Sequence, residues 1–132
     1  MMSKTLELNE FAKEVHQNAI EHGWWDKKRT FGEIIALCHS ELSEALEEHR
    51  NNRPNLYTNC KNEDLKEKGG GGCGVCVYCS ANKPEGIATE LADCIIRILD
   101  YCAYEGIDIE QAIQLKHEYN KTRPYRHGGK RI

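Results

Sequence analysis

Two long stretches of the chain repeat apolar residues with the 3.6-residue period of an α-helix, and this constrains the fold most. The first follows Thr30 and continues to about Arg50, and the second runs from near Gly86 to Tyr104. Their apolar positions are Ile34, Leu37, Cys38, Leu42, Ala45 and Leu46 in the first, and Ile87, Leu91, Cys94, Ile95, Ile98, Leu99 and Cys102 in the second. Because such stripes are buried against other helices, we predict an all-α fold without strands.

Capping residues indicate four helices in a single domain, residues 1–132. Residues 30–33 form a capping box at the start of the second helix. A first helix is expected over residues 9–23 with Asn9 as its N-cap, and a fourth over residues 108–123, before a proline. Their buried positions are expected to be Phe11, Val15 and Ala19 in the first helix and Ile109, Ala112 and Ile113 in the fourth.

Each of the two long helices also carries two acidic residues three positions apart, beside its apolar stripe. Glu41 and Glu44 lie in the first of them, and Glu90 and Asp93 lie in the second. Residues three apart share one face of a helix, and carboxylates at a buried interface need a cation or a donor. A set of oxygen ligands suits Mg²⁺ or Mn²⁺. We therefore predict a divalent metal site, and the alternative is that these acids line a solvated helix edge.

A di-iron centre is the other metal site that a helical bundle commonly builds, and it uses Glu-x-x-His motifs. The chain has six histidines. The residues three positions before them are Lys13, Ala19, Ala36, Leu46, Gln114 and Pro124. None is glutamate, so the sequence disfavours di-iron chemistry.

Charge and hydropathy exclude other classes of function. The net charge is −3, to which the four paired acids contribute −4, so the rest of the chain is nearly neutral. This argues against a nucleic-acid-binding protein. No stretch approaches the roughly 20 apolar residues of a membrane span, and the first residues do not resemble a signal peptide. We expect a soluble cytoplasmic protein with no nucleic-acid or membrane partner.

Residues 51–85 interrupt the helical pattern with a loop that is rich in glycine and cysteine. Its four cysteines are Cys60, Cys73, Cys76 and Cys79. Four thiolates at this spacing predict a structural zinc site that would stabilise the loop. An iron–sulfur cluster, disulfides and free thiols remain as alternatives. The other three cysteines, Cys38, Cys94 and Cys102, fall on apolar stripes and are interpreted as small core residues.

The order of the two acidic motifs carries a family resemblance. Residues 41–44 and then 90–93 resemble the ExxE…ExxD signature of MazG-like, all-α NTP pyrophosphatases. Similarity extends through Gly86–Asp93 and the tail Tyr119–Lys130, and it covers essentially the chain outside residues 51–85. The 45 residues between the motifs exceed the usual family spacing, and the cysteine-rich insertion accounts for most of the excess. The resemblance implies a four-helix MazG-like bundle with this loop inserted between its second and third helices.

The resemblance also implies an activity, the Mg²⁺-dependent hydrolysis of (deoxy)nucleoside triphosphates to monophosphate and pyrophosphate in nucleotide-pool sanitation. Glu41, Glu44, Glu90 and Asp93 would then be the catalytic, metal-holding residues, and either Glu44 or Glu48 would be the general base. A homodimer or homotetramer is implied as well. The alternative function is a non-catalytic helical module for protein interaction, stabilised by zinc, with the acids on its surface.

Substrate contacts are expected from both ends of the chain. The family resemblance implies that His16 and Trp25 bind the base, because they match positions with which members of the MazG-like family bind a pyrimidine; a tryptophan here is equally typical of a core anchor. The last twelve residues, from Lys121, contain five basic residues and no acid. Because arginine and lysine bind phosphate, we expect Lys121 and Arg123 to contact the substrate. Asn120, which directly precedes them in the tail that resembles the family, is expected to contact it as well. The alternative for this tail is a frayed terminus.

Overall fold

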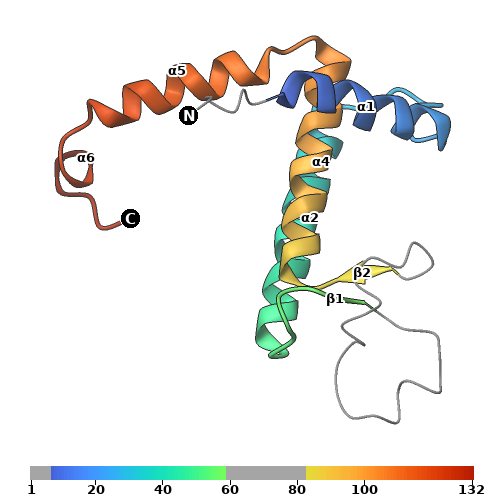
Figure 1. Ribbon diagram of the computed structural model, residues 1–132, viewed down its shortest axis with the longest axis horizontal. Helices are drawn as coiled ribbons and strands as arrows, with labels where there is room; N and C mark the ends of the chain where they lie inside the picture. The colour runs from blue at the N-terminus through green and yellow to red at the C-terminus, as the bar shows by residue number, and fades with distance from the viewer. Residues whose placement is uncertain (1–6, 59–82) are drawn as a thin grey trace, which may run out of the picture. The chain divides into compact units, whose positions relative to one another are not determined.

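The computed structural model describes residues 7–58 and 83–132, and their secondary structure is mostly helical (Figure 1). The helices are α1 (Leu8–Glu21), α2 (Phe31–Arg50), α4 (Ile87–Glu105), α5 (Ile109–Lys121) and the single turn α6 (Arg126–Gly129). The predicted helical fold class is therefore confirmed. In the described ranges, two short strands that were not predicted, β1 (Tyr57–Thr58) and β2 (Pro84–Glu85), form an antiparallel pair. No helix in these ranges has both the length and the apolar character needed to cross a membrane.

The chain divides into two compact units. The terminal unit contains Met1–Lys27 and Leu99–Ile132, and the central unit contains Lys28–Ile98. In the terminal unit α1 contacts α5. In the central unit α2 and the first part of α4 are joined by an ion pair between their side chains, and β1 and β2 pair with each other. Both acidic motifs belong to the central unit.

Three predicted helix boundaries are explained by local capping. At the start of α2, the Thr30 hydroxyl accepts from the Glu33 amide at 3.2 Å, and the Glu33 carboxylate accepts from the Thr30 amide at 2.7 Å. This reciprocal pair is a capping box. At the start of α5, Asp108 accepts from the Gln111 amide at 3.0 Å. Gly106 follows the end of α4 with φ of +69°, a conformation that glycine adopts readily.

The expected N-cap of α1 is wrong, because Asn9 lies inside that helix and caps a different one. The residue before α1 is Glu7, and its side chain makes no capping hydrogen bond. The Asn9 side-chain oxygen instead accepts from the amides of Ile109 at 3.1 Å and Glu110 at 3.4 Å, both in the first turn of α5. Its Nδ2 donates to Asp108 at 2.8 Å. Asn9 therefore satisfies amides at the start of α5 that have no partner within that helix.

Most of the buried apolar residues in the described ranges are small, and the expected buried stripes are only partly buried. The buried apolar residues are Ala12, Ile34, Cys38, Ala45, Cys94, Leu99 and Cys102, which confirms the three cysteines as core residues. Several expected core residues are instead exposed, namely Phe11, Leu42, Leu46, Leu91, Ile95, Ile98, Ala112 and Ile113. The physical reason is that each apolar stripe is wider than the surface that a neighbouring helix of the same chain covers.

The first turn of α2 offers a stabilising substitution, Gly32→Ala. A Cβ at this position would have the Thr30 hydroxyl oxygen, 4.0 Å away, as its nearest neighbour. Alanine restricts the unfolded chain and favours the helix, so we expect unfolding to require about 0.5 kcal/mol more free energy. Urea denaturation measures this gain. The Thr30→Ala variant, which loses the cap, is expected to be destabilised by about 1 kcal/mol. A destabilised Gly32→Ala variant would contradict the prediction.

The two strands hold the chain on either side of residues 59–82. Tyr57 is paired with Glu85, and Thr58 is paired with Pro84. Gly86 follows β2 with φ of +110°, and the backbone carbonyl of Asn55 accepts from the amide of Ala88 in the first turn of α4 at 2.9 Å. The segment before β1 therefore caps α4, and this contact positions the start of the helix that carries Glu90 and Asp93.

Candidate metal centre

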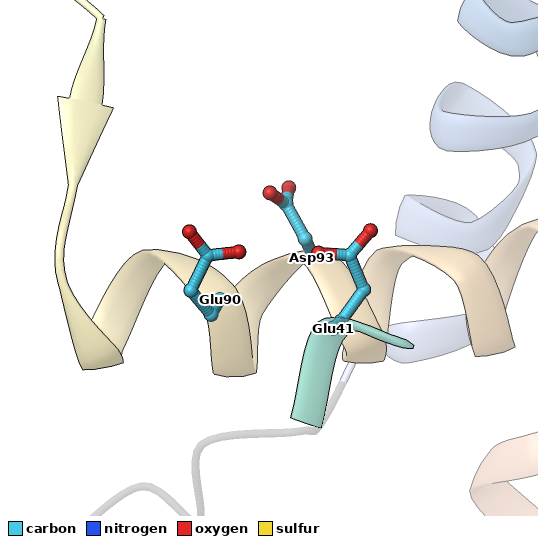
Figure 2. A group of neighbouring side chains, drawn as sticks. All are labelled: Glu41, Glu90 and Asp93. Atoms are coloured by element: carbon cyan, nitrogen blue, oxygen red, sulfur yellow. The ribbon is translucent and has the colours of Figure 1, made fainter. Parts of the chain in front are cut away.

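Three of the four predicted acids converge between two helices of the central unit. Glu41 comes from α2, and Glu90 and Asp93 come from α4; one oxygen of each lies within 4.8 Å of the others (Figure 2). Glu41 is buried, and the other two are half-buried. In an octahedral Mg²⁺ site with ligands at about 2.1 Å, ligand oxygens are roughly 3.0 to 4.2 Å apart. Modest side-chain adjustments would therefore bring these oxygens to coordination distance.

Glu44, the fourth predicted acid, joins this group through Glu90. Burial is the largest of the effects that raise the pKa of Glu90 from its ordinary value of 4.5 to about 7, and side-chain hydrogen bonds with Glu44 and Glu41 and the negative charges of these two residues supply the rest. Burial also raises the pKa of Asp93, as does the charge of Glu41. The acid cluster, defined here as Glu41, Glu44, Glu90 and Asp93, thus retains a proton near neutral pH when no cation is bound.

Arg97 is the residue at this centre that the sequence analysis missed. Its Nε donates to Oε1 of Glu41 at 2.7 Å, which joins α4 to α2. A sequence signal was present, because Arg97 follows Asp93 by four positions, the spacing of an intrahelical ion pair. The structure places its hydrogen bond on the neighbouring helix instead, which sequence spacing alone does not indicate.

Glu48, one of the two predicted candidates for the general base, contacts strand β1. The Tyr57 hydroxyl donates to Oε2 of Glu48 at 2.9 Å. Burial and, next, the hydrogen bond to Glu48 raise the pKa of Tyr57 to about 12, so the hydroxyl remains protonated and continues to donate. Glu48 therefore anchors β1 to the end of α2, whereas Glu44 faces Glu90.

The donor set at this centre consists of oxygens only, which suits the hard cations Mg²⁺ and Mn²⁺. Among the described residues, Glu41, Glu90 and Asp93 form the only group of three potential metal ligands this close together. Burial raises the pKa of the buried Cys38 thiol on α2, and the neighbouring Cys94 raises it as well, so Cys38 favours the neutral thiol. The four predicted zinc ligands, Cys60, Cys73, Cys76 and Cys79, lie outside the described residues.

His16 and Trp25 meet in the terminal unit around Asp100, a residue that the sequence analysis did not identify. Nδ1 of His16 lies 2.7 Å from the Asp100 carboxylate, and Nε1 of Trp25 donates to both its oxygens at 3.0 and 3.2 Å. Tyr104 stacks on the Trp25 ring with centroids 4.2 Å apart. A base that binds here would have to contact other atoms of these rings. The sequence signal was an acid and a tyrosine four positions apart near the end of an apolar helix.

The predicted phosphate-contacting residues also belong to the terminal unit. Asn120 lines a shallow surface pocket on α5, together with Ile113. Lys121 forms an ion pair with Glu118 at 2.7 Å. The Arg123 guanidinium lies 5.9 Å from the centre of the Tyr119 ring. These local contacts hold Lys121 and Arg123 against neighbouring side chains of the same unit.

Similarity to other proteins gives no independent support for this centre. The assignment of a metal site depends on the geometry of the acid cluster and on the two sequence motifs that supply its four acids. No protein-family model, curated protein or solved structure matches this chain.

Proposed function

We propose that this chain is a divalent-cation-dependent pyrophosphohydrolase of nucleoside triphosphates with a MazG-like helical bundle. The observation that carries the proposal is the convergence of the ExxE and ExxD acids. One carboxylate oxygen of each of Glu41, Glu90 and Asp93 lies within 4.8 Å of the others, and Glu44 contributes to the raised pKa of Glu90. Four carboxyl groups in one place are costly unless protons, cations or donors compensate them. A site for Mg²⁺ or Mn²⁺ accounts for their type and their spacing.

In this proposal the acid cluster holds the cation and the chain supplies a base. A bound divalent ion would neutralise charge on the triphosphate and promote attack by water. We assign the acceptance of the water's proton to Glu44, because Glu48 is engaged by the Tyr57 hydroxyl. Glu44 is exposed, which leaves its carboxylate accessible to water and substrate.

The remaining substrate contacts are proposed from the family resemblance and from charge. His16 and Trp25 would bind the base, and Asn120, Lys121 and Arg123 would bind the triphosphate. We further propose a structural zinc ion in the cysteine-rich insertion and a cytoplasmic location.

A homodimer or homotetramer is part of the same proposal. Several large apolar side chains on α2 and α4 are exposed to solvent; Leu46 on α2 is 59% exposed and Ile95 on α4 is 53% exposed. Apolar side chains on two helix faces are typical of surfaces that a second helix covers. A second copy of this chain would complete a four-helix bundle around the central unit.

The identity of the first product tests the proposed activity. We expect the purified protein with Mg²⁺ to convert at least one member of a panel of NTPs and dNTPs to monophosphate and pyrophosphate. EDTA should stop the reaction, and Mn²⁺ should restore it. Orthophosphate as the first product would contradict the proposal. No hydrolysis of any nucleotide with either metal would favour the non-catalytic interaction module.

A further inference from the structure

The ion pair between Arg97 and Glu41 has no role in the proposed hydrolysis and needs its own explanation. The Glu41 side chain is 7% exposed and the Arg97 side chain is 32% exposed, so one partner is almost fully buried and the other reaches solvent. The distance from Nε to Oε1 is 2.7 Å, which is within the usual range of a charge-assisted hydrogen bond. A carboxylate as buried as Glu41 is strongly destabilising when it has no partner. Arg97 supplies that partner.

The guanidinium of Arg97 acts on a second candidate ligand as well. Its positive charge lowers the pKa of Asp93, against the opposing effects of burial and of the Glu41 charge. Lys83 acts on Asp93 in the same direction but more weakly, and its ammonium lies 3.8 Å from Glu85. Among the described residues, Arg97 is therefore the cation in direct contact with the acid cluster.

We propose that Arg97 is the resident counter-cation of the acid cluster and that a divalent cation competes with it for Glu41. This inference rests on the proposed function, because it assumes that the cluster binds Mg²⁺ or Mn²⁺. A positive charge in contact with one ligand and close to another repels an incoming dication. By linkage, a bound dication weakens the contact between Arg97 and Glu41 by the same factor by which Arg97 weakens cation binding. The cluster is thus neutralised in part by the chain itself before a metal arrives.

Calorimetric titration of Mn²⁺ into the metal-free protein tests the competition. The Arg97→Gln variant removes the charge but keeps a hydrogen-bond donor for Glu41, and we expect it to bind Mn²⁺ about tenfold more tightly than the wild type. The Arg97→Lys variant keeps the charge and changes the geometry, and it should bind Mn²⁺ as the wild type does. Equal or weaker binding by Arg97→Gln would overturn the proposal, because it would make Arg97 an orienting residue for Glu41 or a bystander.

Thermal unfolding provides a readout that does not depend on activity. In EDTA we expect Arg97→Gln to unfold at a lower temperature than the wild type, because Glu41 remains buried without a counter-charge. Mn²⁺ should then raise the Tm of Arg97→Gln by more than it raises that of the wild type. A variant that is unfolded in EDTA and folds when Mn²⁺ is added also supports the proposal. A variant that stays unfolded with Mn²⁺ overturns it.

The outcomes separate this inference from the proposed function. If the wild type binds Mn²⁺ and releases pyrophosphate but Arg97→Gln binds no more tightly, only the competition is wrong. If neither protein binds Mn²⁺, the proposed metal site and the competition are both wrong. If the wild type binds no Mn²⁺ and Arg97→Gln binds it, the competition is supported, and the proposed hydrolysis must then be tested with Mg²⁺ and the variant.

Discussion

The Glu90→Gln variant is expected to release no measurable pyrophosphate and yet to be more stable than the wild type in EDTA at pH 8. The loss of activity follows because an amide is a poor ligand for Mg²⁺ and cannot carry the charge of a carboxylate. Residues that hydrogen-bond to the ligands of a metal site already contribute roughly 10 to 100-fold, so the loss of Glu90, a proposed ligand itself, should cost at least about 100-fold. Measurement of pyrophosphate release with saturating Mg²⁺ checks this part of the prediction.

The gain in stability follows from the raised pKa of Glu90. The pKa is about 7 in the folded chain and has an ordinary value of 4.5, so between these two values the folded chain holds a proton that the unfolded chain has released. The contribution of Glu90 to stability is therefore greatest below pH 4.5, falls as the pH rises through this window, and is lowest above pH 7. Glutamine resembles the protonated carboxyl at every pH. The variant should therefore not show this decline when Tm is measured from pH 4.5 to 8 in EDTA.

Glu47→Gln is the matched control for Glu90→Gln. Glu47 lies on α2, where its carboxylate is 61% exposed and pairs with Arg50 at 3.5 Å. Exposed pairs of this kind contribute little to stability, so this variant should retain both its activity and the pH dependence of its Tm. Full activity of Glu90→Gln would show that Glu90 does not hold the proposed cation. A metal-free Tm for Glu90→Gln at pH 8 below that of the wild type would contradict the electrostatic argument.

Gly86→Ala is expected to destabilise the protein by about 3 kcal/mol, the largest structural effect that we anticipate. Its φ of +110° is a conformation that L-residues rarely adopt, and an added Cβ would lie 2.5 Å from the carbonyl oxygen of Asn55 and 2.8 Å from that of Pro54. Both obstacles are backbone atoms, so they cannot rotate away. Either the start of α4 or the segment before β1 must therefore shift. Glu90 lies in the first turn of α4, so a shift of this helix would also move Glu90.

Gly106→Ala separates the clash at Gly86 from the cost of a positive φ alone. Gly106 has φ of +69°, and no atom lies within 4 Å of the position of an added Cβ. Only backbone strain remains there, and we expect a loss of about 1 kcal/mol. Urea denaturation of both variants gives the two losses. Equal values would mean that the contact with Asn55 and Pro54 relaxes without cost.

The helix boundaries and the acid pairs could be predicted from sequence because their causes are local. Thr30 and Glu33 are three positions apart and cap the same turn, as do Asp108 and Gln111. Spacing of three residues likewise places two acids on one helix face whatever surrounds the helix. Such interactions are complete within a few residues, so a linear pattern contains the information that determines them.

The errors concern interactions between residues far apart in the chain. Asn9 was expected to cap its own helix, but it caps one that begins 100 residues later. Arg97 could have paired with Asp93 on the same helix, but its hydrogen bond goes to Glu41, 56 residues away. The width of the apolar stripe on α2 did not reveal that Leu46 would be exposed. In each case the missing information was which element lies opposite, and a periodic pattern does not contain it.

The pairing of Tyr57 with Glu85 and of Thr58 with Pro84 also bears on how this chain evolves. Antiparallel neighbours lie about 5 Å apart, so residues 59–82 leave the helical part and return to it at almost the same point. Segments of very different length could be exchanged at this junction while Glu41 and Glu90 kept their separation. On this geometry the length of the segment between the two acidic motifs is not constrained by the positions of the acids, so we expect insertions and deletions between Thr58 and Lys83 to be tolerated better than changes in either motif.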